Sequence, residues 1–478
     1  MQEKLKEYFS DMLVYKSPGQ SKFFSALSLP SFLRDWLVMK FADKDGHIDK
    51  DEVSQFVKIN IPRKEQWEQL KYAMTHEGQT VRFLSKIRVE IDISTREAYF
   101  SLPDFGFPQR KKEAVVENDV LNAHQKYLLT PNETWGIVEL ACFSADGDRS
   151  RIHMVDFKPF CPYRVELDYF QEVRRYFTIE EWLDVILAAI DYNPAGFLNK
   201  TQKTTMLSRL LPFVEKRLNL IELAPKGTGK SYLFSQISKY GWLVSGGSIT
   251  RARLFYDINK RMNGLVSHYD YVALDEIQSI NFPNQEEIQG ALKGYLESGE
   301  FRIGDHKGIG EAGFVLLGNI DESLMNVEVN MFRELPRIFH ESALLDRFHG
   351  FIKGWDVPRM KENMKANGWA LNVEYLSEIM HLLRDDIVYR AVVDEILRVP
   401  KGADTRDTEA IKRICTGFLK LFFPHVRDVK DINATEFVEF CLNPASSMRA
   451  VIKKQLGIID REFSGKDIPD ITCKLLSQ

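Results

Sequence analysis

The sequence predicts an α/β core followed by a helical lid, with an α+β part before the core that contains a small antiparallel β-barrel. Largely apolar runs near residues 218–223, 271–274 and 314–317 are typical of parallel strands buried on both faces. Residues 80–107 instead alternate apolar and polar side chains around a turn, as a half-buried hairpin does. With 478 residues, the chain is long enough for about three domains of roughly 150 residues each.

The composition is that of a folded protein. Hydrophobic residues make up 44% of the chain and aromatic residues 12%. The net charge of −4 is close to balance, so contacts with nucleic acid would have to come from local basic patches. The sequence contains no apolar stretch of about 18 residues, and its start is polar, so we expect neither a membrane span nor a signal peptide. Scattered cysteines without CxxC spacing indicate reduced thiols in a cytoplasmic protein.

Residues 1–165 form the predicted N-terminal domain. Apolar side chains recur at helical spacing up to about residue 60, and from residue 80 the period becomes that of strands. The first hairpin turns at residues 94–97, and a second strand pair is expected around 135–143 and 151–157. Three basic side chains of the first hairpin can share one face: Arg82, Lys86 and Arg88. This arrangement is compatible with DNA binding, although ordinary solvated strands would give the same pattern.

The remaining chain divides into four predicted segments. A helical linker is expected at 166–205, where Thr178 followed by Glu181 is the signature of a capped helix start. A nucleotide-binding domain is then expected at 206–355, a helical lid at 356–430, and a C-terminal helical tail at 431–478.

A phosphate-binding loop follows the first apolar run, in the order strand, glycine-rich turn, helix. The two glycines of the turn let successive N–H groups point at phosphate oxygens, and the next helix adds its positive end. The lysine can reach the β- and γ-phosphates of ATP, and the serine after it can hold Mg²⁺. The predicted nucleotide-binding residues are Pro225, Lys226, Gly227, Thr228, Gly229, Lys230 and Ser231. Ala224 stands where the pattern has its first glycine, and this small replacement is expected to be tolerated.

Further polar residues follow the apolar runs. Asp275 and Glu276 end the second run; Asp275 would hold Mg²⁺, directly or through water, and Glu276 would polarise the attacking water. Asn319 ends the third run, where its amide can orient that water or contact the γ-phosphate. Arg347 suits a finger that reaches the site of another subunit, because arginine is always charged and binds phosphate in a bidentate manner. A surface arginine is the alternative for Arg347.

These motifs, in this order, resemble those of the AAA+ superfamily: Walker A, Walker B, a sensor asparagine and an arginine finger. The resemblance implies an ATPase that works as a homo-oligomeric ring, because the finger completes the site of the neighbouring subunit. It also implies an arginine in the lid. Arg406, at the start of the helical segment 404–414, is our candidate, and Arg359 is the competing one.

An insert at residues 292–314 separates the two carboxylates from Asn319. We interpret it as a β-hairpin with flanks at 295–302 and 310–314 and a tip at 304–308. In related AAA+ proteins such a hairpin points into the central pore, where Arg302, His306 and Lys307 could contact phosphates. A solvated loop is the alternative.

The resemblance can be narrowed to the BrxL family, the Lon-related proteins of BREX phage-defence systems. It is carried by strings such as NLIELAPKGTGKSYLFSQIS, GYLESGEFRIG, LLDRFHGFIKGWDVPRM and GADTRDTEAIKRICTGFLKLFFPH, which run through most of residues 160–455. The family implies a ring, single or stacked, with a replicative-helicase-like core that binds double-stranded DNA and acts with other BREX components. Members often end in a Lon-like protease domain with a Ser-Lys dyad. Here only Ser446, Ser447 and Lys453 lie in a short tail, so a natural or truncated short form without protease activity is expected.

The alternative function is a protein-remodelling AAA+ factor related to Lon. Unfoldases of that type place an aromatic pore loop after the Walker A helix. The corresponding residues 246–257 carry Arg251 and Arg253 before an aromatic pair. Basic residues favour DNA and aromatic residues favour peptide, so this segment leaves the substrate open.

Overall fold

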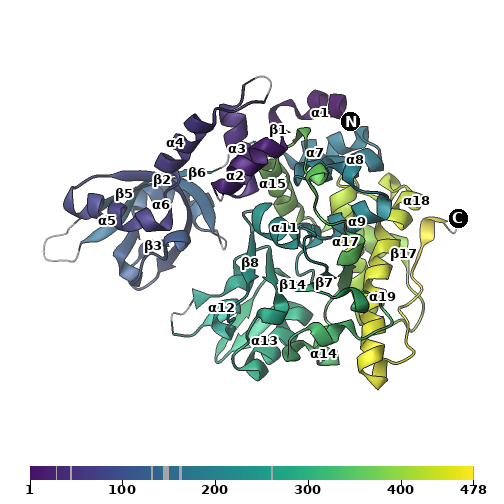
Figure 1. Cartoon of the computed structure of the whole chain (residues 1–478). Coiled ribbons are helices and arrows are strands. Elements are labelled where there is room, and N and C mark those ends of the chain that lie inside the picture. Colours follow the sequence, from purple (N-terminus) through teal and green to yellow (C-terminus); the bar gives the residue numbers. More distant parts are fainter. Residues whose placement is uncertain are drawn as a thin grey trace. The chain divides into compact units, whose positions relative to one another are not determined.

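The computed structural model describes residues 1–476 except 28, 44–45, 131–132, 144–149, 161–163 and 260–261 (Figure 1). The chain forms two compact units: Lys40–Arg164, and Met1–Met39 together with Val165–Gln478. The first 39 residues, which the sequence analysis grouped with the barrel, thus belong to the larger unit. The reason is a pairing that sequence spacing does not reveal: β1 (Leu13–Lys16) lies antiparallel to β16 (Gly368–Leu371). Within the described ranges, no helix combines the length and apolar character that a membrane span requires.

The smaller unit is built around a closed five-stranded barrel with the order β2-β3-β4-β6-β5. Its strands are β2 (Val81–Asp92), β3 (Glu97–Ser101), β4 (Ala114–Val116), β5 (Thr134–Phe143) and β6 (Arg151–Pro159). The two expected strand pairs are present, but the barrel is not purely antiparallel, because β4 and β6 pair in parallel. A parallel pair needs a crossover, which α6 (Asn118–Leu128) and β5 provide. This topology, with a helix between the third and fourth strands, is that of an OB-fold.

Two helices precede the barrel in the smaller unit, α4 (Lys50–Asn60) and α5 (Trp67–His76). Trp67 and Met74 lie two turns apart on α5 and pack into the barrel core. Trp67 meets Phe105 and Phe107 with ring centroids 5.0 and 4.9 Å apart. The unit therefore has a hydrophobic core of its own.

A five-stranded parallel sheet forms the centre of the larger unit, in the order β15-β7-β14-β11-β8. The strands are β7 (Leu220–Ala224), β8 (Gly241–Ser245), β11 (Tyr271–Asp275), β14 (Gly313–Asn319) and β15 (Gly350–Lys353). The three apolar runs are β7, β11 and β14, which are buried as expected. Because β14 lies between β7 and β11, the polar residues that end these strands meet at one edge of the sheet.

Helices make up most of the rest of the larger unit (Figure 1). They are α1 (Gln2–Phe9), α2 (Pro18–Ala26), α3 (Ser31–Phe41), α7 (Leu167–Val173), α8 (Ile179–Ala189), α9 (Lys200–Ser208), α10 (Leu211–Val214), α11 (Lys230–Gln236), α12 (Arg251–Leu254), α13 (Gln285–Ser298), α14 (Ser342–Leu345), α15 (Val373–Leu383), α16 (Val388–Ile396), α17 (Thr405–Phe422), α18 (Ala434–Phe437) and α19 (Asn443–Ile459). The segment expected to form the lid contains α15, α16 and α17. The capped start at Thr178 is present: its hydroxyl accepts from Glu181 N at 3.2 Å, and the Glu181 carboxylate accepts from Thr178 N at 3.0 Å.

The insert before β14 differs from the expected hairpin in its bounds. Residues 295–298 continue α13, because Ile288, Leu292, Tyr295 and Leu296 recur at helical spacing and are all buried. Gly299, with a φ of 79°, ends that helix. The hairpin proper consists of β12 (Glu300–Ile303) and β13 (His306–Ile309), and residues 310–314 only lead into and begin β14. A second short pair, β9 (Tyr256–Asp257) and β10 (Met262–Asn263), lies in the segment after α12, and β17 (Leu397–Arg398) pairs with β18 (Thr472–Cys473).

Candidate nucleotide-binding and hydrolysis site

The phosphate loop joins β7 to α11 at the carboxyl edge of the parallel sheet, where such sheets bind ligands. Gly227 and Gly229 have φ angles of 81° and 78°, which glycine adopts at no steric cost. A pocket of about 420 Å³ opens at this edge. It is lined by Lys226, Gly227, Thr228, Gly229, Lys230, Ser231, Tyr232, Asp275, Glu276 and Asn319. All predicted residues of the loop, the strand ends and Asn319 therefore meet in one pocket, except Pro225.

Lys230 extends across the loop and donates three long hydrogen bonds to oxygen atoms. Its Nζ donates to the carbonyl oxygens of Pro225 at 3.3 Å and Ala224 at 3.4 Å, and to Asn319 Oδ1 at 3.4 Å. Burial lowers the pKa of Lys230. A phosphate oxygen would offer this half-desolvated ammonium a shorter, charge-assisted bond, so the side chain is placed to take an anion.

The two carboxylates at the end of β11 have different surroundings. Asp275 is buried and accepts from Glu276 N at 2.9 Å, whereas Glu276 is exposed in the pocket. Glu276 has a φ of 49°, a left-handed conformation that costs a non-glycine residue on the order of 1 kcal/mol or more. Asp275 and Ser231 supply oxygen ligands of the kind that Mg²⁺ takes, and Glu276 remains free to face a water molecule.

Gln278 fixes the main chain of Asn319, a role that the sequence analysis missed. Its Nε2 donates to Asn319 O at 2.6 Å, and its Oε1 accepts from Asn319 N at 3.4 Å. The amide of Asn319 is thereby held toward Lys230. A glutamine two residues beyond a carboxylate pair belongs to no motif, so the sequence carried no signal for it.

Arg209 binds both the phosphate loop and the strand before it. This second supporting residue was not predicted from the sequence either. Arg209 and Glu222 are both 0% exposed, and Arg209 Nη2 donates to Glu222 Oε1 at 2.6 Å. Arg209 Nη1 also donates to the carbonyl oxygen of Thr228 at 2.8 Å. The charge that Glu222 carries on β7 is thus neutralised by a side chain that also fixes the loop.

Ala224, which stands at the first glycine position of the loop pattern, packs against Gly354. Ala224 is fully buried at the end of β7. A Cβ atom placed on Gly354 would lie 2.2 Å from the Ala224 Cβ and 2.8 Å from Glu222 Oε1. The absence of a side chain at Gly354 therefore makes room for the methyl group of Ala224.

We expect Gly354→Ala to lower the free energy of unfolding by about 1–3 kcal/mol, because it overpacks the base of the loop. Nucleotide affinity should fall with it, and Ala224→Gly in the same chain should restore part of both, since it removes the closest contact. Thermal unfolding and nucleotide titration measure the two effects. Gly290→Ala on α13 is the matched control: nothing lies within 4 Å of its new methyl group, so it should be neutral or slightly stabilising. Equal effects of the two substitutions would contradict the fit between Gly354 and Ala224.

Arg347 and Arg406 lie together and do not line the phosphate pocket of their own chain. Both contact Glu297 on α13: Arg347 Nε lies 2.8 Å and Arg406 Nη2 3.1 Å from Glu297 Oε2. Arg406 Nη1 also lies 2.6 Å from Asp346 Oδ2. Arg406 thus lies beside the finger candidate, not over the loop that precedes α11. Arg359, the competing candidate, is exposed and does not line the pocket either, although Met360 N donates to Gly227 O at 2.8 Å.

The β12–β13 hairpin presents two basic residues side by side. Arg302 and Lys307 are register partners and both are exposed; Lys307 lies 3.0 Å from Glu300. His306 is placed differently from our expectation, because its ring stacks on Tyr256 with centroids 3.6 Å apart. In the neighbouring segment Arg253 is exposed, whereas Arg251 lies 2.9 Å from Glu287.

The basic residues of the barrel face acidic partners. Arg82 is exposed but lies opposite Glu139 in the register of β2 and β5. Lys86 lies 3.7 Å from Asp104, and Arg88 lies 3.0 Å from Glu90. The three residues are separated by even numbers of positions on β2, so their side chains lie on the same face of the strand, as expected. This face, however, also contacts acidic side chains.

Lys453, the lysine considered for a Ser-Lys dyad, is buried on α19. Its Nζ lies 2.7 Å from Asp407, which also pairs with Arg449. Ser446 and Ser447 lie near the start of the same helix, seven and six residues before Lys453. The lysine is therefore committed to a buried ion pair with α17.

Known proteins resemble this chain over nearly its whole length. Residues 152–468 match the family described as "Lon-like protease BrxL-like, ATPase domain", and residues 7–142 match "BREX system Lon protease-like protein BrxL N-terminal". The Lon-like protease BrxL of Escherichia coli O9:H4 (strain HS) is 29% identical over 436 residues, which are 90% of this chain and 61% of that protein. The Lon-like protease BrxL of Bacillus cereus (strain H3081.97) is 29% identical over 479 residues, 98% of this chain and 68% of that protein.

The chain thus spans only part of the length of these relatives. The match to the ATPase domain nevertheless covers more than half of the chain and includes the phosphate loop, both carboxylates and Asn319. It agrees with the resemblance read from the sequence, and it implies the AAA+ type of α/β fold for the larger unit. The chain belongs to the BrxL-like family and carries its Lon-like ATPase domain.

Proposed function

We propose that this protein is an ATP-dependent, DNA-binding ring protein of a BREX-type phage-defence system. The observation that carries the proposal is the single pocket that gathers the glycine-rich loop, Lys230, Asp275, Glu276 and Asn319. Lys230 and the loop N–H groups bind the phosphates, Ser231 and Asp275 hold Mg²⁺, and Glu276 accepts a proton from the attacking water. Asn319 orients that water toward the γ-phosphate.

Hydrolysis takes place between subunits in this proposal. Arg347 and Arg406 both pair with Glu297, away from the pocket of their own chain, and in the proposed ring the phosphates bound by a neighbouring copy replace this carboxylate as a partner. Turnover per subunit should then rise steeply with protein concentration until the ring is assembled. A rate per subunit that stays constant over the same range, with no change of particle size, would contradict hydrolysis between subunits.

DNA binding is proposed for two surfaces. The smaller unit has the OB-fold topology, a fold that often binds nucleic acids. The hairpin of the larger unit places Arg302 directly opposite Lys307. Lys307 also pairs with Glu300, and the two adjacent exposed cations suit an anionic ligand such as the DNA backbone.

We expect Arg302→Ala together with Lys307→Ala to weaken DNA binding and to flatten its salt dependence. Loss of two phosphate contacts should make the slope of log K against log salt shallower by about two. Binding of a duplex measured at several salt concentrations gives that slope. Lys401→Ala with Arg461→Ala removes the same charge from other exposed positions and should leave the slope unchanged. An unchanged slope in the hairpin variant would show that the hairpin does not contact DNA phosphates, and the smaller unit would then be the proposed binding surface.

The alternative is a remodelling factor that acts on proteins. It is favoured by the exposed apolar residues near the same hairpin, Ile258 and Ile309. The experiment that separates the two functions compares stimulation of ATP hydrolysis by duplex DNA with stimulation by an unfolded protein. Stimulation by the unfolded protein alone would overturn the DNA proposal.

A further inference from the structure

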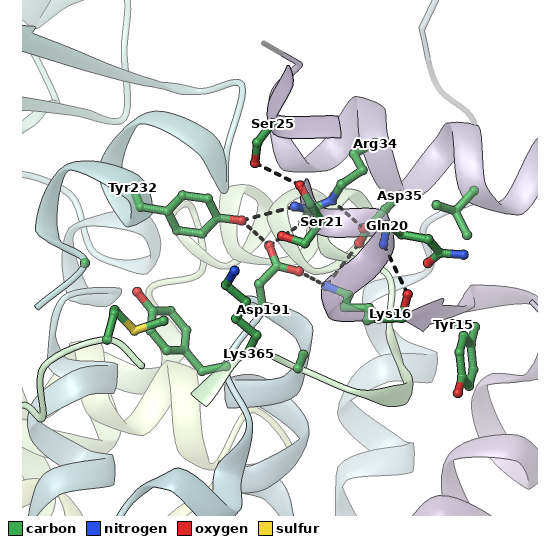
Figure 2. A pocket seen from close by; sticks show the side chains of 16 residues that line it. Tyr15, Lys16, Gln20, Ser21, Ser25, Arg34, Asp35, Asp191, Tyr232 and Lys365 are labelled. Carbon is green, nitrogen blue, oxygen red and sulfur yellow. Dashed lines mark hydrogen bonds and ion pairs between the residues drawn. The ribbon is translucent and has the colours of Figure 1, made fainter. Parts of the chain in front are cut away.

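The larger unit contains clusters of buried ion pairs that the proposed chemistry does not use. One of them joins the N-terminal segment to α11. Asp191 lies 2.8 Å from Lys16 Nζ and also pairs with Arg34, and Tyr232 Oη in the first turn of α11 donates to Asp191 at 2.5 Å (Figure 2). This cluster supports the phosphate loop of its own chain. Another cluster contacts the loop that carries Arg347, on the side proposed to serve a neighbouring copy.

Arg449, on α19, binds the main chain on both sides of Arg347. Its Nη1 donates to the carbonyl oxygens of Asp346 at 3.0 Å and Phe348 at 2.7 Å. Its Nη2 donates to Asp346 Oδ1 at 2.5 Å, and its Nε donates to Asp407 Oδ1 on α17 at 2.7 Å. The Arg449 side chain is 0% exposed. One rigid fork of donors therefore joins α17 and α19 to the loop.

The main chain and the side chain of Arg347 are held in different ways. The bonds from Arg449 fix the main chain before and after this residue. The Arg347 side chain instead contacts Glu297, which is 49% exposed, and the carbonyl oxygen of Ala343. A phosphate bound by a neighbouring copy can therefore replace Glu297 as a partner while the main chain of Arg347 stays in place.

The same cluster reaches Arg406 through one carboxylate. Asp346 Oδ1 accepts from Arg449, and Asp346 Oδ2 lies 2.6 Å from Arg406 Nη1. Asp407, which follows Arg406 in the chain, pairs with both Arg449 and Lys453. Apolar residues of similar size often stabilise a fold as well as a buried ion pair does, so stability alone gives no reason for this cluster. Its contacts instead fix the geometry of the two arginines.

We propose that Arg449 is a positioning residue, which fixes the main chain of Arg347 and, through Asp346, the side chain of Arg406 for hydrolysis in the neighbouring subunit. The inference rests on the proposed function, in which both arginines act on the pocket of another copy. Arg449 itself does not line the pocket of its own chain. Helix α19, in the segment expected to be a C-terminal tail, thereby controls the rate of hydrolysis in the adjacent subunit.

Arg449→Lys tests the positioning role, because it keeps the buried charge but replaces the fork of donors with one ammonium group. We expect kcat for ATP hydrolysis to fall about 10- to 100-fold, since a shift of about 1 Å in a catalytic group can cost that much. ATP affinity and the size of the assembled particle should stay native, because the residues of the pocket are unchanged.

Lys453→Met is the matched control. It removes the other cation that pairs with Asp407, one turn further along α19, and leaves the bonds from Arg449 to the loop in place. The melting temperature should fall, whereas turnover below that temperature should stay native. If Lys453→Met slowed turnover as much as Arg449→Lys does, the effect of Arg449 would be one of stability, and the positioning role would be wrong.

Rings assembled from two variants separate a misplaced finger from a general loss of structure. Arg449→Lys subunits keep a working pocket, and Glu276→Gln subunits keep a working finger. In an equimolar random ring about a quarter of the interfaces combine the two, so turnover should recover to about a quarter of the native rate. Arg347→Ala should lose turnover about 1,000-fold or more and recover in the same way. Lys230→Ala should not recover, because both partners then have a defective pocket.

The outcomes for Arg347→Ala and Arg449→Lys distinguish the two levels of the proposal. If Arg347→Ala loses turnover and recovers in mixed rings, hydrolysis between subunits stands. Native turnover by Arg449→Lys, or a loss that mixing does not restore, would then overturn the positioning role alone. Native turnover by Arg347→Ala would contradict hydrolysis between subunits and, with it, the role of Arg449.

Discussion

Glu276→Gln is expected to slow ATP hydrolysis by a factor of about 100 to 10,000 while leaving ATP binding close to that of the native protein. Glutamine keeps the shape of the side chain but cannot accept the proton of the attacking water. The effect should be confined to turnover, because Glu276 is exposed in the pocket, whereas the phosphates are held by the loop and Lys230. Phosphate release under saturating ATP measures the first quantity, and equilibrium titration with ATP measures the second.

The left-handed backbone conformation of Glu276 is a reason to expect the loss of turnover at this position and not at other exposed glutamates. Strain of this kind persists where the surrounding structure imposes it, and here it places the carboxylate beyond Asp275 and into the pocket. The variant should also keep an assembled ring bound to ATP, since the chemical step is blocked. Glu286→Gln, which makes the same change at an exposed position of α13, should hydrolyse ATP normally. Turnover by the Glu276 variant at the native rate would show that another group activates the water.

The sequence predicted those parts of the site whose residues lie close together in the chain, next to a recognisable strand. The phosphate loop, the carboxylate pair and Asn319 each follow an apolar run, and parallel strands bring their carboxyl ends to one edge. The family resemblance read from the same strings is confirmed. The capped start of α8 is equally local, since Thr178 and Glu181 satisfy each other's main-chain donors.

The rest depends on contacts between residues far apart in sequence. Arg209 lies just after α9 in a stretch without a motif, and it acquires its role only when β7 and the loop pack against it. The parallel pair of β4 and β6 follows from how the barrel closes, which alternation of side chains does not encode. Likewise, the start of α17 was recognised as a helix, but the position of Arg406 beside Arg347 follows from the packing of α17 near α13.

Arg209→Met is expected to lower the free energy of unfolding of the larger unit by about 3–5 kcal/mol. The substitution removes the cation that is hydrogen-bonded to Glu222 and leaves this carboxylate without that partner in a fully buried strand. It also takes the donor away from the carbonyl oxygen of Thr228, so the loop loses its fixed shape and nucleotide affinity should fall as well. Calorimetry in the absence of nucleotide measures the first effect and ATP titration the second. Arg390→Met, which breaks pairs with Asp394 and Glu409 at the surface, should cost less than about 1 kcal/mol.

The double variant Arg209→Met with Glu222→Met separates the two roles of this pair. Two apolar side chains of similar length remove the buried charge altogether, and such replacements of buried ion pairs are often neutral or stabilising. Stability should therefore recover in large part. Nucleotide affinity should not recover, because the carbonyl oxygen of Thr228 still lacks its donor. If affinity returned together with stability, Arg209 would act only by neutralising Glu222, and the bond to Thr228 would contribute nothing to the shape of the loop.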